Sequence, residues 1–333
     1  RDQPRSRGLG DVYKRQMLRA DMDALPIQEK TGLPFESKVP GVMHACGHDI
    51  HTSNLLTVAE ILNRTKDQWK GKVKLVFQPA EENGGGGREM IKAGLMDEIP
   101  DACFALHVEN GVPGKIVVGS RYLTAYSDSY KITVHGKAAH SSTPEEGVDA
   151  VYIAASIVTA LHGIISRNLS PMDRATLNVG MIHGGTAPNI IADEVTLGVM
   201  LRNLSKESRE AMMKKIETIS NGIAESMGGS CDLAFRAGYA AVYNDEKFSD
   251  FVAATFRKYE DIIHVDLGDG KPEDWLITGE HPLLGAEDFG FYSQKAPSCM
   301  IWVSVGGNSP KHSPGFCIDE RYIKLCTRAM AMT

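Results

Sequence analysis

Side chains that can bind a metal ion gather in four short segments of this sequence. In the first, Cys46 and His48 stand two residues apart around a glycine, so that both side chains can face one point. A thiolate and an imidazole are good ligands for zinc and similar transition ions. The competing interpretation is a buried free cysteine beside a helix-capping Asp49. The residue types leave open whether His44 and His51 support these ligands.

The second segment carries the adjacent carboxylates Glu81 and Glu82, directly after the apolar run 73–77 and shortly before four glycines. Adjacent carboxylates repel each other unless a cation is present or one of them is protonated. Two carboxylates in different environments can also divide the work, one binding metal and the other moving protons. A solvated acidic loop is the simpler interpretation, but the position at the end of an apolar strand disfavours it.

Two histidines complete the set of candidate ligands. His107 closes the apolar run 102–106, and His312 lies in the loop after the apolar run 300–305. Each of them alone is more often structural than a ligand. The five candidate donors are Cys46, His48, Glu82, His107 and His312. Five N, O and S donors exceed the four of a closed tetrahedral zinc site, and they would suit two metal ions about 3.5–4 Å apart.

The elements that would position these residues alternate between short apolar runs and helical stripes. Near-continuous apolar runs are typical of strands that helices cover on both faces. The predicted strands are 17–20, 73–77, 102–106 and 300–305, and the predicted helices are 53–62 and a segment from residue 319. In such an α/β fold, functional sites lie at strand ends. We predict a catalytic α/β domain with a mixed central sheet, residues 17–122 and 237–333.

The middle block, residues 123–236, follows a different pattern. Its predicted order is β-α-β-β-α-β, over 129–134, 148–165, 175–182, 194–201, 206–227 and 231–235. That order is typical of a ferredoxin-like unit, usually a four-stranded antiparallel sheet with helices on one face. The other face or the edge of such a sheet must be covered, and a second subunit is one candidate. We therefore expect an inserted lid and dimerisation domain.

Length and composition agree with two globular domains. The chain has 333 residues, of which 42% are hydrophobic and 23% charged, and this excludes a disordered or fibrous chain. The net charge of −6 argues against nucleic acid as the main partner. The most apolar stretch, 150–165, is broken by Ser156, Thr159 and His162, which favours a buried helix over a membrane span. Six scattered cysteines suit a reducing compartment, so we expect a cytoplasmic protein.

The first sixteen residues differ from the rest of the chain. They contain five basic residues, two acids and no hydrophobic periodicity, and they lack the apolar region of a signal peptide. We expect residues 1–16 to be a non-native leader and leave them out of the fold.

The sequence resembles the hippurate hydrolase or N-acyl-amino-acid amidohydrolase branch of the dinuclear metallopeptidase superfamily. That superfamily also includes aminoacylase and the plant auxin-conjugate hydrolases. The similarity runs from Met17 to the C-terminus, and its motifs occur in order. They are LRADMDALP at 18–26, HACGHDIH at 44–51, QPAEE at 78–82, GKAAHSS at 136–142, GGTAPN at 184–189, GAEDF at 285–289 and HSPGF at 312–316.

The resemblance implies roles for individual residues. Two divalent transition ions (zinc, manganese, cobalt or nickel) would be held by Cys46, His48, Glu82, His107 and His312. Glu81 would be the general acid and base. His140 would enter the active site of the partner subunit, and Asn189 and Arg202 would contact substrate. Asp23 would orient a ligand or balance charge.

The sequence departs from the family at three places. An unrelated leader stands where the family has a helix and a strand upstream of Leu18, and the C-terminal helix stops early. Asn203 follows the arginine where Thr or Ser is usual. We expect the upstream difference to affect stability and activity rather than the identity of the site.

The implied function is metal-dependent hydrolysis of N-acyl amino acids by a homodimer that binds neither nucleic acid nor a membrane. The products would be a carboxylate and a free amino acid. One alternative is a metal-binding dimer fragment without activity, because every motif residue could persist in such a fragment. Another is thiol catalysis, with Cys46 as nucleophile and a histidine as base. Histidine-rich metal storage is disfavoured, because the donors lie far apart in the sequence.

Overall fold

A computed structural model describes residues 15–264, 267, 271–307 and 309–333. The chain divides into two compact units. The first unit comprises the described residues up to 123, together with 242–281 and 287–333, and the second comprises 124–241 and 282–286. Residues 1–14 of the expected leader lie outside the described residues. Arg15 and Gln16 belong to the first strand, β1 (Arg15–Asp21).

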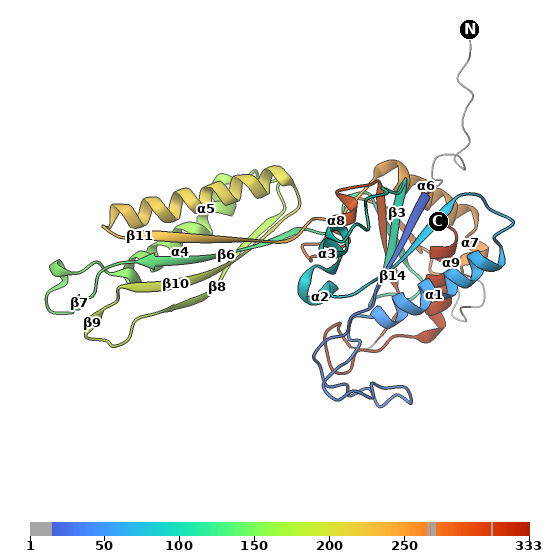
Figure 1. Ribbon diagram of the computed structural model, residues 1–333, viewed down its shortest axis with the longest axis horizontal. Helices are drawn as coiled ribbons and strands as arrows, with labels where there is room; N and C mark the ends of the chain where they lie inside the picture. Colours follow the sequence, from blue (N-terminus) through green and yellow to red (C-terminus); the bar gives the residue numbers. More distant parts are fainter. Residues whose placement is uncertain (1–14, 265–266, 268–270, 308) are drawn as a thin grey trace, which may run out of the picture. The chain divides into compact units, whose positions relative to one another are not determined.

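The first unit is built on a six-stranded sheet with the strand order β13-β4-β14-β3-β1-β2 (Figure 1). Neighbouring strands run parallel except β14 and β4, which are antiparallel. The strands besides β1 are β2 (Lys72–Gln78), β3 (Ala102–Glu109), β4 (Ile116–Gly119), β13 (Leu276–Gly279) and β14 (Ser298–Ser304). The predicted α/β class with a mixed central sheet is confirmed.

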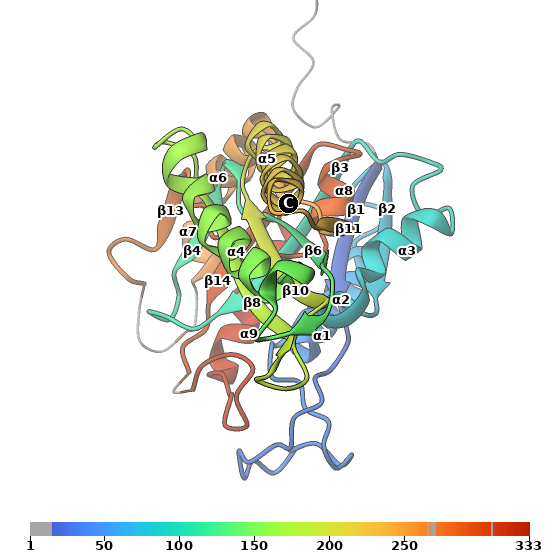
Figure 2. The same cartoon turned by 90° about the vertical axis from the view of Figure 1, so that its left-hand side faces the viewer.

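The second unit contains a four-stranded antiparallel sheet with the strand order β11-β6-β10-β8. Its elements follow one another as β6 (Tyr126–His135), α4 (Ala150–Asn168), β8 (Ala175–Gly184), β10 (Glu194–Asn203), α5 (Lys206–Ser226) and β11 (Ser230–Tyr239). The two helices lie side by side and share one apolar core with the sheet (Figure 2). Side-chain caps start both helices, because Asp149 accepts a hydrogen bond from the backbone of Val151 and Ser205 accepts one from Ser208.

Short elements complete the second unit. They are the paired strands β7 (Ala139–His140) and β9 (Ile190–Ile191) and a 3-10 turn at Pro144–Glu146.

By length and composition alone, α4 is the one helix in the described part of the chain that could cross a membrane, with a mean hydropathy of 1.4. One side of this helix, however, buries Ile153, Ile157 and Leu161 in the core of the second unit. The spacing of three to four residues between them is that of an amphipathic helix that faces a core.

One face of the sheet in the first unit carries the larger apolar core. Alternation along β1 sends Leu18 and Ala20 to this face, where they join Phe104 of β3. Three helices bury apolar side chains against it, namely α1 (His48–Arg64), α6 (Glu246–Lys258) and α9 (Ile323–Ala331). The carboxylate of Asp245 caps α6 by accepting a hydrogen bond from the backbone of Phe248.

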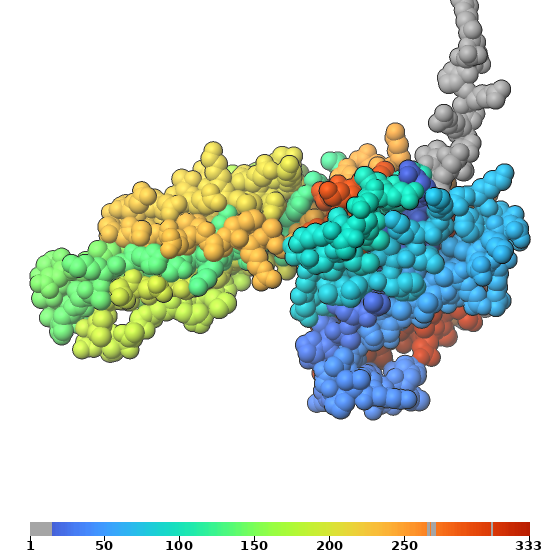
Figure 3. Space-filling view, in the orientation of Figure 1, coloured from blue at the N-terminus to red at the C-terminus, as the bar shows by residue number. Residues whose placement is uncertain are grey.

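The segment 25–45 contains no helix and forms the lower edge of the first unit in Figure 3. Two backbone hydrogen bonds join it to the C-terminal loop, from Lys30 N to Pro314 O and from His312 N to Ala45 O, each 2.8 Å long. Between the two segments lies a group of apolar side chains that we call the loop cluster, formed by Leu25, Ile27, Met43, Ala45, Phe316 and Ile318. The loop cluster therefore ties the segment that precedes Cys46 to the segment that carries His312.

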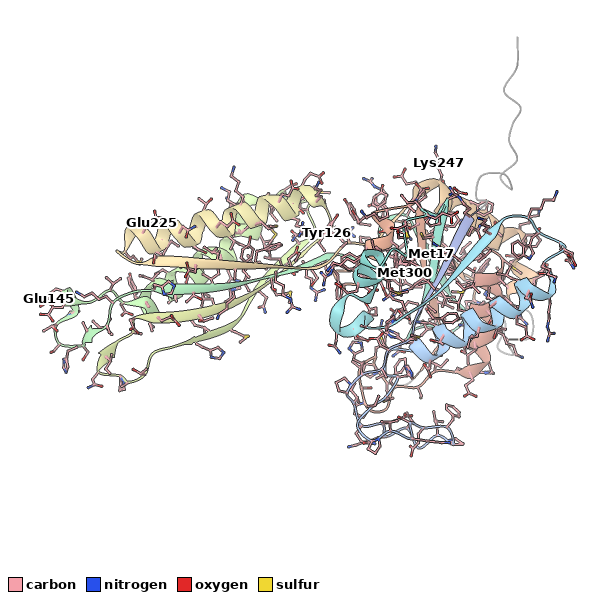
Figure 4. All side chains as sticks on the ribbon, in the orientation of Figure 1. Met17, Tyr126, Glu145, Glu225, Lys247 and Met300 are labelled. Atoms are coloured by element: carbon pink, nitrogen blue, oxygen red, sulfur yellow. The ribbon has the colours of Figure 1, made fainter. Side chains whose placement is uncertain are left out.

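The opposite face of the sheet carries a smaller core. Met17 and Met300, labelled in Figure 4, pack in this core. Arg19 and Asp21 of β1 share the face of Met17, since side chains alternate along a strand. The helices on this side are α3 (Gly86–Lys92) and α8 (Gly290–Ser293). Short elements of the first unit are α2 (Glu81–Gly84), α7 (Glu260–Ile263), the paired β5 (Arg121–Tyr122) and β12 (Tyr243–Asn244), and a 3-10 turn at Glu320–Tyr322.

Candidate metal centre

The predicted metal ligands all belong to the first unit and lie near the ends of three neighbouring strands. β3, β1 and β2 are adjacent and parallel, so their C-terminal ends meet at one edge of the sheet. His107 lies in β3, and Glu82 lies in α2, which follows β2. Cys46 and His48 stand where α1 begins, and His312 comes from the loop after β14.

The donor atoms of these five residues converge. Cys46 Sγ lies 3.5 Å from His107 Nε2 and 3.4 Å from His312 Nε2. His312 Nε2 lies 3.1 Å from Glu82 Oε1. Donor atoms within 4.8 Å of one another form a trio of Cys46, His48 and His107 and a second trio of Cys46, Glu82 and His312. Ligands around a tetrahedral ion, bound at about 2.0–2.3 Å, lie about 3.3–3.8 Å apart, so these spacings suit metal coordination.

His48 gives a separate indication that these residues fit a cation. Its side chain is buried, and its Nε2 atom has no hydrogen-bond partner among the described residues. An unpaired buried nitrogen costs about 1–3 kcal/mol. The other ring nitrogen, Nδ1, lies 3.2 Å from Asp23 Oδ1, which is how a carboxylate commonly orients a metal-binding imidazole. A divalent cation at Nε2 would satisfy the ring, so the residues present fit a metal site.

Asp23 also connects His48 to the pair of glutamates. Its two carboxylate oxygens accept hydrogen bonds from the backbone N–H groups of Glu81 and Glu82, each 3.0 Å long. Burial works to raise the pKa of Asp23, but the hydrogen bonds from His48 and from these two N–H groups outweigh it and lower that pKa. The two glutamates therefore start the short helix α2 instead of forming a solvated loop, and Glu81 is buried.

At two positions near the candidate ligands, close packing leaves no room for a side chain, so only glycine fits. Gly47, between Cys46 and His48, has a φ of 85°, and a Cβ there would lie 2.3 Å from Val108 Cγ2 of β3. At Gly86, after the glutamates, a Cβ would lie 1.7 Å from the carbonyl oxygen of Pro79. Both positions let backbone that carries candidate ligands pack directly against its neighbours.

A buried arginine organises the carboxylates behind the glutamate pair. Arg19 is only 1% exposed, and its guanidinium lies 2.6 Å from Asp21, 2.6 Å from Asp288 and 3.0 Å from Glu287. Gln78, the last residue of β2, donates further hydrogen bonds to Asp288, of 2.7 and 2.8 Å. Buried carboxylates repel one another, so this group depends on the charge of Arg19.

Glu81 stands between the candidate metal ligands and this buried group. Its carboxylate lies within 4.8 Å of His48 and Glu82 on one side and of Glu287 and Asp288 on the other. Its Oε1 atom accepts a hydrogen bond of 3.3 Å from the backbone N–H of Asp288. Burial, and then the negative charges of Glu287 and Asp288, raise the pKa of Glu81 to about 10. At neutral pH this carboxyl group therefore holds a proton in the metal-free protein, and the positive charge of a cation at the neighbouring donors would lower its pKa and free it to act as a base.

The electrostatics of the other ligands disfavour thiol catalysis. Burial, reinforced by the charge of Glu82, raises the pKa of the Cys46 thiol far above its usual range. Without a cation this thiol stays neutral, and a neutral thiol is a poor nucleophile. Burial also lowers the pKa of His107, so that its ring is neutral, as a metal ligand must be.

The three predicted residues of the second unit do not lie together. His140 ends β7, is exposed, and its Nδ1 lies 2.7 Å from the hydroxyl of Ser142. Asn189 is its neighbour, because the Asn189 carbonyl accepts a hydrogen bond of 3.1 Å from the backbone of Ser141. Arg202 lies near the other end of the sheet, eight positions along β10 from Glu194, or about 27 Å.

Sequence reasoning assigned no role to Arg19, Glu287 or Asp288. One signal was present, since Arg19 is a charged residue in the middle of a predicted buried strand and must therefore find charged partners. Glu287 and Asp288 belong to the motif GAEDF, whose partners are far away in the sequence.

An α/β sheet whose strand ends bring nitrogen, oxygen and sulfur donors around buried carboxylates is the arrangement of a metal-dependent hydrolase. Comparison with known families agrees with this class. The model described as Peptidase family M20/M25/M40 matches residues 17–333, and the chain belongs to this family.

Individual relatives agree with this assignment. The chain is 36% identical over 324 residues to Thermostable carboxypeptidase 1 of Saccharolobus solfataricus, covering 95% of this chain and 78% of the relative. It is 33% identical over 316 residues to N-acetylcysteine deacetylase of Bacillus subtilis, covering 94% and 79%. A crystal structure of a Bacillus subtilis protein described as a dinuclear metal binding peptidase from the M20 family matches with a TM-score of 0.81 at 29% identity, covering 96% and 80%. The resemblance inferred from the sequence is confirmed, and the protein is a hydrolase of this family.

Proposed function

We propose that this protein is a metal-dependent amidohydrolase that cleaves the amide bond of N-acyl amino acids, such as acetyl or benzoyl derivatives. The products are a carboxylate and a free amino acid. The observation that carries the proposal is the convergence of the five donors, with Glu81 beside them and against Asp288. The similarity to a relative named N-acetylcysteine deacetylase supports an N-acyl amino acid as substrate.

Two divalent transition ions (zinc, manganese, cobalt or nickel) would be held by the two trios, which share the thiolate of Cys46. When bound, they would polarise the amide carbonyl and acidify a water molecule. A thiolate ligand favours such ions over magnesium or calcium.

Glu81 moves the proton in this mechanism. Its carboxylate accepts the proton of the attacking water and returns it to the nitrogen of the leaving amine. The hydrogen bond from Asp288 N holds the carboxylate in place, and Asp23 holds the backbone at Glu81. Burial of Glu81 keeps bulk water away from the transferred proton.

We infer further that residues 123–236 are a ferredoxin-like lid and dimerisation domain inserted into a catalytic domain of residues 17–122 and 237–333. The exposed Met200, on the face of the sheet opposite the helices, supports a partner there. In the resulting homodimer, His140 would stabilise the oxyanion in the partner's site. Asn189 and Arg202 would contact substrate, the arginine by pairing with its carboxylate. We assign the dimer to the cytoplasm, without nucleic acid or membrane partners.

The first test is metal analysis of the purified protein together with a panel of N-acyl amino acids, including N-acetylcysteine and hippurate. We expect two ions per chain and release of free amino acid. Peptides with a free C-terminus belong in the panel, because one relative is named a carboxypeptidase. If only the peptides are cleaved, the protein is a peptidase and the proposed N-acyl amino acid substrate is wrong. Two bound ions without any turnover would favour the inactive dimer. Loss of turnover to chelators but not to iodoacetamide would exclude thiol catalysis.

Glu81→Ala should abolish turnover while both ions remain bound. Glu36→Ala, at an exposed glutamate, is the matched control and should change neither. Loss of an ion in the Glu81 variant would make Glu81 a ligand and contradict its role as base.

A mixing experiment tests whether His140 acts across the dimer. His140→Ala should lower kcat with both ions retained. When its subunits are exchanged with those of Glu81→Ala, half of the dimers are mixed, and each mixed dimer has one site with both groups intact. About a quarter of wild-type activity should return. No recovery after verified exchange would place His140 in the site of its own subunit or outside any site.

A further inference from the structure

His51 is a buried residue whose role the sequence left open. It lies in the first turns of α1 and is 0% exposed. Its Nδ1 atom lies 2.5 Å from Asp21 Oδ1, at the end of β1. Its Nε2 atom accepts a hydrogen bond of 2.9 Å from the backbone N–H of Val108 in β3. One side chain thus joins a helix to two strands at the edge of the sheet that carries the metal ligands.

These contacts determine where the ring proton of His51 resides. A backbone N–H can only donate, so Nε2 of His51 carries no proton. The proton of the neutral ring is therefore on Nδ1, where it is donated to the carboxylate of Asp21. Both ring nitrogens are thereby engaged, which leaves His51 no lone pair for a metal ion.

The backbone of Val108, which His51 contacts, also contacts the candidate ligand His107. While the N–H of Val108 binds His51, the carbonyl oxygen of Val108 accepts a hydrogen bond of 2.6 Å from His107 Nδ1. This bond places the proton of His107 on Nδ1 and leaves Nε2 free, 3.5 Å from Cys46 Sγ. The N–H and the C=O of Val108 belong to the two consecutive peptide groups on either side of its Cα, so the backbone conformation at Val108 couples the two imidazoles.

Asp21 is in turn held from its other side. Its Oδ2 atom lies 2.6 Å from the guanidinium of Arg19, which also binds Asp288 at 2.6 Å. The backbone N–H of Asp288 binds Glu81. A continuous series of buried polar contacts thus runs from the proposed general base to the imidazole of His107.

We propose that His51 is a positioning residue for the metal ligand His107, acting through the backbone of Val108 and anchored by Asp21. This rests on the proposed function only in that His107 binds a metal ion. Asp21, His48 and His51 could themselves be considered a cation site, since their donor atoms lie within 4.8 Å of one another. Arg19 already supplies a positive charge to Asp21, and His51 has no free nitrogen, so the positioning role fits better.

Two substitutions separate this role from simple packing. In His51→Gln the side-chain oxygen can still accept the N–H of Val108, whereas His51→Asn is too short to reach it. We expect the Asn variant to bind one of its two ions about 10–100-fold more weakly and to show an altered visible spectrum when loaded with cobalt. The Gln variant should recover most of the affinity and the wild-type spectrum. His281→Gln, at an exposed histidine whose Nε2 atom contacts the nearby carbonyl of Thr278, is the control.

If both His51 variants bind two ions as tightly as the wild type, with an unchanged cobalt spectrum, the inference is wrong even if they are less stable. If the variants do not fold, nitrogen NMR of the zinc-loaded wild type decides. His51 and His107 should both carry the ring proton on Nδ1, and a proton on Nε2 of His51 would overturn the inference.

These measurements need no substrate. A wild-type protein that binds two ions but hydrolyses no N-acyl amino acid would refute the proposed function and leave the role of His51 standing. A wild-type protein that binds no ion would refute both.

Discussion

At the scale of single residues, the site depends on buried charges that exist only in balanced groups. Arg19 is the positive member of the largest group, facing Asp21, Glu287 and Asp288 in a region closed to water. A second balanced group lies nearer the candidate metal ligands. There the carboxylate of Asp23 contacts the imidazole of His48 and accepts hydrogen bonds from two backbone N–H groups. Removing one partner from such a group leaves the others unpaired, which costs more than the contact contributed.

Arg19→Met tests the first group. The methionine fills a similar volume but leaves three carboxylates without their cation, so the free energy of unfolding should fall by about 3–5 kcal/mol. The measurement is urea denaturation of the metal-free protein. Arg64→Met, which breaks an exposed pair with Glu60, should cost about 0–1 kcal/mol. If the two substitutions lower the free energy of unfolding equally, the buried carboxylates do not depend on the charge of Arg19.

Asp23→Asn tests the second group. An amide has one acceptor oxygen in place of two, so its NH2 group must face a backbone N–H or the ring of His48. Metal affinity should fall about 10–100-fold, as measured by competition with a chelator. Asp67→Asn, at an exposed aspartate, should leave affinity unchanged, and unchanged affinity in the Asp23 variant would argue against its orienting role.

At the scale of elements, two of the candidate ligands, Cys46 and His312, are brought together by packing between segments of little regular structure. Cys46 and His48 follow the segment 25–45, and His312 has a φ of 62° in its loop. The loop cluster and two backbone hydrogen bonds hold these segments to each other. The spacing between Cys46 and His312 therefore depends on a small apolar core outside the sheet.

Phe316→Ala tests this dependence. Phe316 is 5% exposed in the loop cluster, and its truncation should cost about 3–5 kcal/mol and loosen the trio that contains His312. Phe256→Ala removes an equally buried ring from the larger core, at α6, with a similar cost in stability. Metal analysis after dialysis should show loss of one ion in the Phe316 variant and none in the Phe256 variant. Loss of stability without loss of metal in both would show that the loop cluster does not position His312.

At the scale of the whole molecule, metal binding is coupled to the folding of the first unit. The five donors are spread from residue 46 to residue 312, so ions that bind them favour the folded chain over the unfolded one. The metal-free fold, in contrast, retains protons that the unfolded chain would release.

The pH dependence of stability follows from these retained protons. Burial opposes protonation of His48, but the charges of Asp21 and Asp23 raise its pKa to about 9, and burial raises that of Glu81 to about 10. Both pKa values lie above those of the unfolded chain, so between pH 7 and 9 the metal-free folded state binds more protons. Its stability must therefore fall as pH rises, by about 1.4 kcal/mol per pH unit for each retained proton.

Thermal unfolding with and without chelator at pH 7, 8 and 9 checks this expectation. The melting temperature should fall with pH in the metal-free protein and change less in the metal-loaded one, because the ions displace the protons. Calorimetry in buffers of different ionisation enthalpy should detect proton release on metal binding. A metal-free protein that becomes more stable toward pH 9 would contradict these pKa shifts.

The sequence by itself determined the class of fold and the identity of the candidate ligands. Apolar periodicity is a local property, so the runs 17–20, 73–77, 102–106 and 300–305 lie within β1, β2, β3 and, apart from its last residue, β14. The chemical types of Cys46, His48, Glu82, His107 and His312 limit what they can bind, and strand ends in an α/β sheet are where such residues meet.

Only the tertiary structure decided which residues support those ligands. Arg19 pairs with Asp288 across 269 residues, and Val108 meets His51 across 57 residues. No local pattern encodes such pairs, because the sequence around one partner does not show which distant residue it will meet. The same holds for α2, which Asp23 caps from 58 residues away, and for Arg202, whose separation from His140 follows from its place along β10. The chemical type of each residue limits the interactions that it can make. Long-range packing then selects the partner residues with which it makes them.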